Sequence, residues 1–389
     1  MSHAILSPSA ASRWLTCTPS ARLELQFENV ESDFAREGTL AHAICECLLN
    51  GYLQSGSPFL TISEWKFFKE QEFYTEAMYE HCQAYASYVL SFFAEGDILK
   101  VEQRIDLRAL IPESFGTSDS YIYKPFTKHL HVFDLKFGKG VPVSAEGNKQ
   151  LKIYALGILE ELLCFYDVET VTLHIYQPRI QNNSDFTISV KELLAWRKEI
   201  EPLAKLAFDG EGEFVAGNHC LFCRAKATCR ALADYNTELA KHDFNNPNLL
   251  EDAEIIEIIE RKGIFESWIK AVAEHALNEA LKGKAWPGYK LVEGKSNRQY
   301  KDQGEIVRNL LKNLNFGYVS EIYKPQELLG ITELTKKLGT DNFAKYVEPF
   351  LVKPKGAPTL VPVSDNRPVF SNSQSDFNDG FSEEDSWDI

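Results

Sequence analysis

The sequence predicts an α/β protein in which helices flank a central mixed sheet, followed by a helical C-terminal extension. Three short segments rich in β-forming residues, 101–107, 118–124 and 130–137, follow one another closely. Segments with helical periodicity lie on either side of them, at about 71–94 and 148–163. Helices that alternate with strands in this way are typical of a mixed α/β core.

The N-terminal part is predicted to be helical. Ser7 suits an N-cap and Pro8 suits a first helical position, so a helix is expected at about 7–15. Leucine and isoleucine recur at helical spacing over 40–48, which predicts a second helix. An aromatic-rich third helix is expected at about 71–94.

The strands are followed by further alternation. Residues 125–128 form a plausible hairpin turn between the second and third strands. A strand at 171–176 separates the helix at 148–163 from another at about 190–208. Residues 250–282 are strongly helical, and the chain is Ser/Asn/Asp-rich from about 364, which predicts disorder.

The charge of the chain limits how it could contact nucleic acid. Its formal net charge is −15 over 389 residues, which argues against a generic nucleic-acid coat because phosphate binding needs clustered cations. Much of the excess lies in the tail, 365–389, which is strongly acidic. We therefore expect any contact with DNA to be local.

Neither a membrane span nor a secretory signal is expected. No apolar run approaches the roughly 18 residues of a spanning helix. The N-terminus lacks the basic and apolar regions of a signal peptide. These features predict a cytosolic protein without a membrane partner.

Asp134 and Lys136 carry the first chemical signal. Residues two apart on a strand point to the same face, so this carboxylate and this ammonium project together. A carboxylate can bind a divalent metal, while a nearby ammonium can orient or help deprotonate a water and offset developing charge. An isolated D-x-K is more often a solvated ion pair, so its neighbours decide the interpretation.

The neighbouring residues favour a metal site. The predicted hairpin brings Asp119 and Asp134 within reach of one ion. Gln150 and Tyr154 share one face of the next helix, where they could hold a DNA phosphate or orient the lysine. His42 could complete a site of oxygen ligands with one nitrogen, which suits Mn²⁺ as well as Mg²⁺.

Three of the eight cysteines form a tight cluster. Cys220-x2-Cys223-x5-Cys229 supplies three thiolates in ten residues, and Cys17 is the natural fourth ligand. Four thiolates would also suit structural Zn²⁺, and the spacing alone leaves that alternative open. The remaining cysteines (Cys45, Cys47, Cys82, Cys164) are interpreted as buried small apolar residues.

In order and spacing, the first set of motifs resembles that of RecB-like PD-(D/E)XK nucleases. The set is His42, Glu102, Gly116-x-x-Asp119, Asp134-Leu135-Lys136 and Gln150-x-x-x-Tyr154. The resemblance implies that His42, Asp119 and Asp134 bind the catalytic metal and that Lys136 assists the attacking water. It makes Gln150 and Tyr154 supporting residues that contact substrate, and Glu102 the early strand glutamate.

The cysteine pattern resembles the 4Fe-4S site of AddB-type and CRISPR-associated iron–sulfur exonucleases. Cys17, Cys220, Cys223 and Cys229 would then bind a structural cluster that ties the start of the chain to the end of the nuclease domain. The resemblance implies a nuclease domain over 1–235. Periodicity and composition predict a mostly helical region over 236–363 and a disordered acidic tail over 364–389.

The wider chain, including Trp286-Pro287-Gly288-Tyr289, resembles an uncharacterised phage and prophage family of the same superfamily. That resemblance implies DNA end processing in phage replication or recombination, in the cytoplasm of a bacterial host. DNA is then the expected partner, with a phage single-strand-binding or annealing protein as a second one.

We therefore expect a Mg²⁺- or Mn²⁺-dependent DNA exonuclease. The alternative is a module of nuclease fold that binds DNA ends or a partner with little cleavage. In a third reading, the chain is a zinc-stapled scaffold whose D-x-K is accidental.

Overall fold

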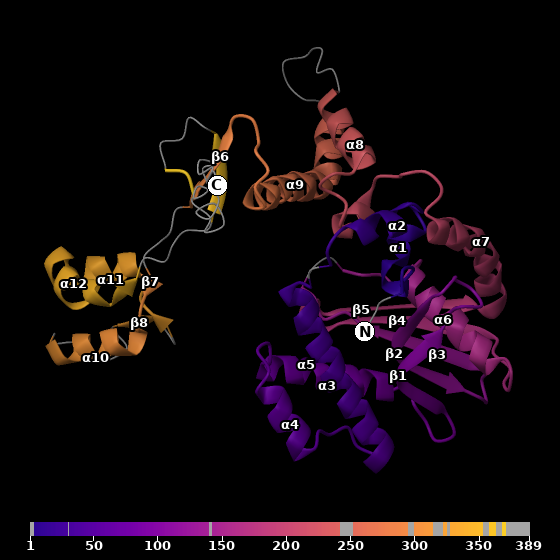
Figure 1. Cartoon of the computed structure of the whole chain (residues 1–389). Coiled ribbons are helices and arrows are strands. Elements are labelled where there is room, and N and C mark those ends of the chain that lie inside the picture. The colour runs from indigo at the N-terminus through magenta and orange to yellow at the C-terminus, as the bar shows by residue number, and fades with distance from the viewer. Residues whose placement is uncertain are drawn as a thin grey trace, which may run out of the picture. The chain divides into compact units, whose positions relative to one another are not determined.

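The computed structural model describes residues 4–29, 31–139, 142–241, 252–294, 299–313, 322–324, 327–352, 358–362 and 368–370. Its contacts divide the chain into two compact units, Met1–Ile269 and Lys270–Ile389 (Figure 1). The predicted disordered tail over 364–389 lies outside the described residues except for 368–370, where Val369 forms an isolated bridge with Val292.

The first unit is an α/β fold built on a five-stranded mixed sheet. The strands lie in sequence order, and each pairs antiparallel with the next except β3 and β4, which are parallel. Helix α6 makes the crossover between those two strands, as a parallel connection requires. The strands are β1 (Ile98–Asp106), β2 (Phe115–Lys124), β3 (His129–Leu135), β4 (Thr170–Gln177) and β5 (Asn182–Ser189).

Helices cover both faces of this sheet (Figure 1). One buried cluster joins the sheet to α3 (Asp33–Ser55), α4 (Ile62–Lys69) and α5 (Glu76–Leu90). The opposite cluster joins it to α6 (Lys149–Leu162), α7 (Val190–Asp209) and the N-terminal helices. The remaining helices are η1 (Pro8–Ala10), α1 (Ala11–Trp14), α2 (Ser20–Leu23), η2 (Glu24–Gln26), η3 (Pro178–Ile180), η4 (Asn218–Phe222), α8 (Arg230–Lys241) and α9 (Asp252–Leu281), of which α9 continues into the second unit.

The sequence predicted the main elements of this fold. The strands at 101–107, 118–124, 130–137 and 171–176 are confirmed as β1 to β4, and the turn at 125–128 joins β2 to β3. The helices at 148–163, 190–208 and 250–282 are confirmed within one or two residues. The helix expected at 71–94 is shorter, 76–90, because Thr75 caps its start by accepting a hydrogen bond from the Met78 amide.

The edge strand β5 and the helix α4 were not predicted. The first half of β5 (Asn182–Ser189) is polar, Asn182-Asn183-Ser184-Asp185, so the apolar alternation that marks a strand is confined to residues 186–188 and is too short to be recognised alone. Its pairing with β4 supplies the stabilisation that local propensity does not.

The second unit has a small core of its own around α10 (Gln303–Asn313), α11 (Ile331–Leu338) and α12 (Thr340–Tyr346). Three two-stranded pairings accompany these helices. They involve β6 (Tyr289–Glu293) with β11 (Pro358–Pro362), β7 (Gln299–Tyr300) with β10 (Leu351–Val352), and β8 (Tyr323–Lys324) with β9 (Glu327–Leu328); a short 3-10 turn, η6 (Glu348–Phe350), precedes β10.

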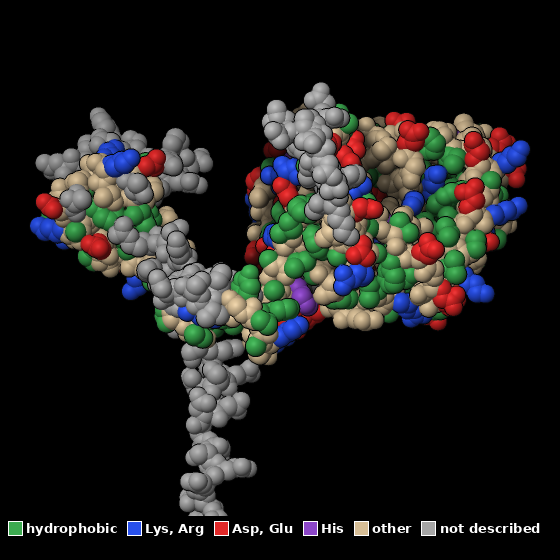
Figure 2. Space-filling model, turned by 90° about the horizontal axis from the view of Figure 1, so that it is seen from above, with side chains coloured by type: hydrophobic (Ala, Val, Ile, Leu, Met, Phe, Trp, Pro, Cys, Tyr) green, Lys and Arg blue, Asp and Glu red, His purple; other side chains and the backbone are tan. Residues whose placement is uncertain are grey.

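Two surface properties bear on function. No helix among the described residues is long and apolar enough to cross a membrane. In Figure 2, Lys and Arg side chains are interspersed with Asp and Glu side chains over the visible face. That face offers no broad basic surface, so a contact with nucleic acid would have to be local there.

Candidate metal and cysteine sites

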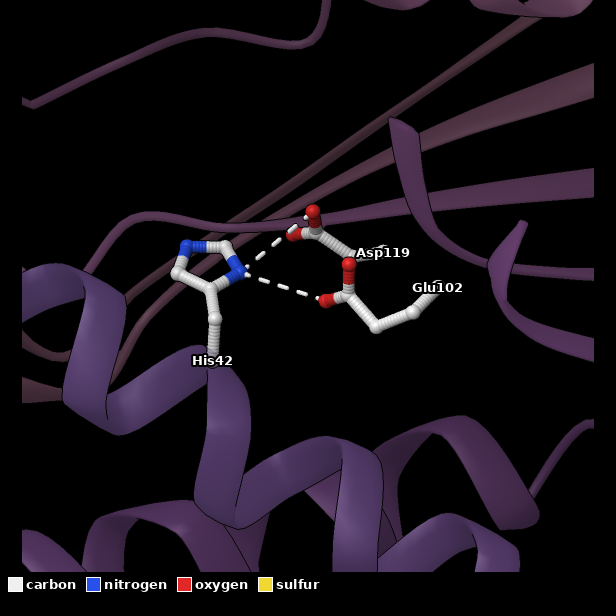
Figure 3. Close-up of side chains that lie close together, drawn as sticks. All are labelled: His42, Glu102 and Asp119. Carbon is white, nitrogen blue, oxygen red and sulfur yellow. Dashed lines mark ion pairs between the residues drawn. The ribbon is translucent and has the colours of Figure 1, made fainter. Parts of the chain in front are cut away.

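His42, Glu102 and Asp119 form what we call the carboxylate site (Figure 3). His42 Nδ1 lies 3.4 Å from Asp119 Oδ1 and 3.8 Å from Glu102 Oε1. One ligand atom from each residue lies within 4.8 Å of the other two. Helix α3 supplies the imidazole, while the adjacent strands β1 and β2 supply the carboxylates.

The two strands meet at this site in an unusual way. Val101 pairs with Ser120 and Gln103 with Ser118, so Glu102 and Asp119 lie opposite each other without forming a ladder pair. Glu102 has φ = 44°, in the left-handed region that side chains other than glycine rarely adopt. Such strain costs of order 1–3 kcal/mol and concentrates at functional sites.

The strain accompanies a change of face along β1. Leu99 belongs to the core on the α3–α5 side, whereas Ile105 belongs to the core on the α6–α7 side. Strict alternation would place these two residues on one face, because they are six apart. The alternation of side chains between the two faces of β1 is therefore interrupted once between Leu99 and Ile105, an interval that contains Glu102.

Asp134, Lys136 and Gln150 form an adjoining group, which we call the lysine group. Lys136 Nζ lies 2.8 Å from Asp134 Oδ2 and donates to Gln150 Oε1 at 2.9 Å. The Gln150 amide in turn donates to Asp134 Oδ1 at 3.0 Å. The predicted projection of Asp134 and Lys136 to one side is thus seen as a direct ion pair, and Gln150 fixes the orientation of both.

The lysine group and the carboxylate site are linked through β3. The Leu135 amide donates to Asp119 Oδ2 at 2.7 Å, so the strand that carries Asp134 also orients Asp119. Asp134 is not a member of the 4.8 Å group, although its charge acts on both His42 and Asp119. Glu102, which the sequence did not place among the metal ligands, belongs to the group.

Tyr154 lies beside both groups and is buried. Burial and the charges of Asp134 and Asp119 raise its pKa, so the phenol remains protonated and can donate a hydrogen bond. Its ring packs against Gly116, where an added Cβ would lie 2.6 Å from Tyr154 Cε1. The glycine of Gly116-x-x-Asp119 therefore makes room for this tyrosine.

Carboxylates outnumber the cationic groups around the carboxylate site. Burial raises the pKa of Glu102, and burial together with Asp119 raises the pKa of Asp134 although Lys136 opposes the shift. Burial also opposes the charging of His42, but Asp119 and Glu102 hold the pKa of the imidazole well above its ordinary value. Three carboxylates at close range thus favour a cation among them.

The donor set fits a hard divalent cation. Two carboxylates and one imidazole suit Mn²⁺ or Mg²⁺, and the three donors already lie within 4.8 Å of one another. The side chains of Asp119 and Glu102 are 13% and 23% exposed, so an ion and a substrate could reach them from solvent.

The four predicted cysteines also come together. Cys17, Cys220, Cys223 and Cys229 line one cavity of about 20 Å³, with Arg13, His219 and Lys226 beside them. We call this group the cysteine site. Burial raises the pKa of Cys220, and it raises that of Cys223 to about 12, which keeps these thiols protonated unless a metal binds them.

The spacing of these thiols bears on which metal they suit. Tetrahedral zinc, with Zn–S of about 2.3 Å, places its sulfurs about 3.8 Å apart. Within the described residues, no three of the four cysteines have their sulfurs all within 4.8 Å of one another. Binding of a tetrahedral zinc would therefore require some of these sulfurs to move closer together.

Hydrogen bonds reinforce the junction at the cysteine site. Thr18 Oγ1 donates to the carbonyl oxygen of Glu211 at 2.5 Å, and Arg22 donates to that of Phe208. The buried carboxylate of Glu24 accepts from the Arg224 amide at 2.7 Å and pairs with Arg13. The start of the chain is thereby held against residues about two hundred positions later.

The other cysteines only partly match the interpretation as buried apolar residues. Cys45 and Cys82 are buried between α3 and α5, and Cys47 is half-buried. For Cys164 the prediction was wrong, because it lies exposed just after the end of α6.

The first unit is thus an α/β protein that carries a histidine–carboxylate metal-type site and a separate four-cysteine site. The chain belongs to the family described as "protein of unknown function (DUF2800)", whose model matches residues 3–368. The crystal structure of SSO0001 aligns with 55% of this chain and 95% of that chain, at 16% sequence identity and a TM-score of 0.24. That TM-score is too low to support an argument.

Proposed function

We propose that this chain is a metal-dependent DNA nuclease with a PD-(D/E)XK core of the RecB-like type. The observation that carries the proposal is the convergence of His42, Glu102 and Asp119 beside the Asp134–Lys136–Gln150 group. The motif resemblance identifies these residues from the sequence alone. Their proximity in a sheet with one parallel pair supports that choice.

In this proposal His42, Asp119 and Glu102 would hold the ion, with Asp134 as a further ligand. A bound Mg²⁺ or Mn²⁺ supplies a Lewis acid for the phosphoryl oxygen and lowers the pKa of a bound water. Lys136 offsets the negative charge that develops on the phosphate as the water attacks. Gln150 keeps the ammonium in place, and Tyr154 donates a hydrogen bond toward the substrate.

The proposal assigns a structural role to the cysteine site. Cys17, Cys220, Cys223 and Cys229 would bind a 4Fe-4S cluster that closes a loop of about two hundred residues and has no part in hydrolysis. Zinc is the alternative. A brown anaerobic preparation with broad visible absorbance and bound iron supports the cluster, whereas a colourless preparation with stoichiometric zinc contradicts it.

Hydrolysis is tested with end-labelled single- and double-stranded DNA in Mg²⁺ or Mn²⁺. The unmodified protein should shorten at least one substrate, and Lys136→Ala should reduce the rate by at least about a hundredfold. Lys191→Ala, at an exposed lysine of α7, is the control and should retain full activity. A DNA-binding protein without cleavage in either metal would instead be a binding module of nuclease fold.

A role in phage replication or recombination is part of the same proposal and rests on the sequence resemblance. DNA ends are the proposed substrate, the bacterial host cytoplasm is the proposed location, and a phage single-strand-binding or annealing protein is a proposed partner. Coprecipitation of such a protein with the tagged chain from infected cells, compared with a variant truncated at residue 363, tests the partner.

A further inference from the structure

A polar groove lies next to the cysteine site and outside the residues of the proposed nuclease centre. Its volume is about 570 Å³, within the range of roughly 300–1,000 Å³ that is typical of ligand sites. The groove is formed by two distant parts of the first unit, around residues 4–29 and 222–224. We call it the arginine groove.

Two guanidinium groups line the arginine groove and share one buried carboxylate. Arg13 and Arg224 both pair with Glu24, whose side chain is only 3% exposed. Two positive charges against one negative charge leave the groove with a net positive charge of one. That balance matches a ligand with a single negative charge, such as a phosphodiester.

Among the described residues, one donor of Arg13 has no acceptor. Its Nε is buried and has no hydrogen-bond partner there, whereas its Nη2 pairs with Glu24. Buried donors in folded proteins are nearly always paired. Because this atom is closed to solvent, an anionic oxygen in the groove would supply the missing acceptor only after a change of the Arg13 rotamer.

An apolar platform stands at the same groove. Phe222 is 82% exposed and Leu25 is 53% exposed, and both belong to the lining. Phe222 lies between Cys220 and Cys223 in η4, and the neighbouring Arg224 amide is anchored on Glu24. The turn that carries two cysteines therefore also carries an exposed ring beside a positively charged residue.

We infer that the arginine groove binds single-stranded DNA, with one phosphodiester at Arg13 and Arg224 and one unstacked base on Phe222. Ser7, Ser9 and Asn29 line the same groove and offer polar groups to the backbone and the base. Aromatic rings beside a positive groove are the usual means of binding single strands without sequence preference. The inference rests on the proposed function only in naming DNA as the nucleic acid.

The test is binding of a fluorescein-labelled twelve-nucleotide oligothymidylate to the full chain with its native metal content and no added divalent ion. Phe222→Ala should weaken binding roughly tenfold, because one stacked base is lost. Phe222→Tyr, which keeps an aromatic ring, should bind almost as tightly as the unmodified protein. Arg224→Gln should lower the slope of log affinity against log salt by about 0.7, the value for one phosphate contact on a single strand.

Phe165→Ala is the matched control, because Phe165 is 83% exposed and lies outside the groove. It should bind like the unmodified protein. If Phe222→Ala binds as tightly as Phe165→Ala, the inference is overturned whatever Arg224→Gln does, because a lone cation attracts any anion.

The same variants separate this inference from the proposed function. If the protein cleaves DNA but Phe222→Ala binds the oligonucleotide as tightly as the unmodified protein, the nuclease proposal stands and the groove does not bind single strands. If the protein cleaves nothing in Mg²⁺ or Mn²⁺, yet Phe222→Ala weakens binding, the groove binds single strands and the nuclease proposal is wrong.

Discussion

The carboxylate site and the cysteine site lie in the same unit, yet they are organised in different ways. The carboxylate site has its donors within 4.8 Å of one another, and a backbone amide of β3 orients Asp119. In the cysteine site no three sulfurs lie within 4.8 Å of one another, and the side chains come from segments about two hundred residues apart.

The difference teaches which site would depend on its proposed metal for structure. Strands and helices position the carboxylates, so loss of the proposed ion there should impair the proposed chemistry and leave the fold intact. The cysteine site joins the chain's start to residues 220–229, so loss of the proposed metal there should loosen the whole unit.

The largest expected effect is on stability, at the cysteine site. Cys220→Ala removes a ligand, and a cross-link that closes a loop of this length stabilises a fold by roughly 5 kcal/mol. We expect the free energy of unfolding in urea to fall by about that amount. Cys164→Ala, at an exposed cysteine, is the control; equal unfolding of the two variants would contradict the structural role.

The second largest effect is on activity, at the carboxylate site, with little change in stability. Asp119→Asn keeps an oxygen that can accept from the Leu135 amide but removes the charge that would bind the ion. Cleavage of labelled DNA in Mn²⁺ should fall by roughly a thousandfold, while the unfolding free energy changes by less than about 1 kcal/mol. Asp185→Asn on β5 should change neither, and a large loss of stability in Asp119→Asn would break the comparison.

A smaller effect is the pH dependence of stability that the buried histidines of the sheet should cause. Burial lowers the pKa of His174 to about 4 and that of His131 to about 3. Below about pH 6.5 the unfolded chain binds protons that the folded chain excludes, so stability should fall as the pH falls toward 4. For His174 this amounts to about 2 kcal/mol at pH 5.

Glutamine does not titrate, so His174→Gln removes the proton that this side chain takes up on unfolding. Urea unfolding at pH 7 and pH 5 should show a loss in the unmodified protein that exceeds the loss in the variant by about 2 kcal/mol. Identical pH dependence in both proteins would mean that the histidine is solvated and does not contribute.

The smallest effect concerns the strain at Glu102. Asparagine adopts left-handed backbone more readily than glutamate, so Glu102→Asn should raise the unfolding free energy by about 0.5–1 kcal/mol. The same variant should bind Mn²⁺ more weakly by calorimetry, because a charged donor is lost. Gln103→Asn on the same strand is the control, and a destabilised Glu102→Asn would show that the left-handed residue is not strained.

Much of the fold could be predicted from the sequence because its strands and helices have strong local signals. The β2–β3 hairpin and helix α6 combine clear periodicity with a turn or a cap, and they carry Asp119, Asp134 and Gln150 to one place. The order of the motifs therefore indicated which side chains should meet.

The exceptions arose where tertiary pairing outweighs local pattern. The polar first half of β5 forms because β4 offers it an open edge, and those four residues carry no strand signal of their own. Glu102 points into the carboxylate site because its own left-handed backbone changes which face of β1 the following side chains occupy. No periodicity argument detects such a residue, because alternation is assumed rather than tested.

The junction between the start of the chain and the region after α7 also constrains how the protein is made. Thr18 and Arg22 find their acceptors only at Glu211 and Phe208, and Cys17 meets the other three cysteines only after residue 229. At a synthesis rate of about 5–20 residues per second, the ribosome would take roughly 10–40 s to deliver those partners. During that interval the emerging N-terminal segment would have to remain unaggregated, and a metal at the cysteine site would have to be loaded after most of the unit had left the ribosome.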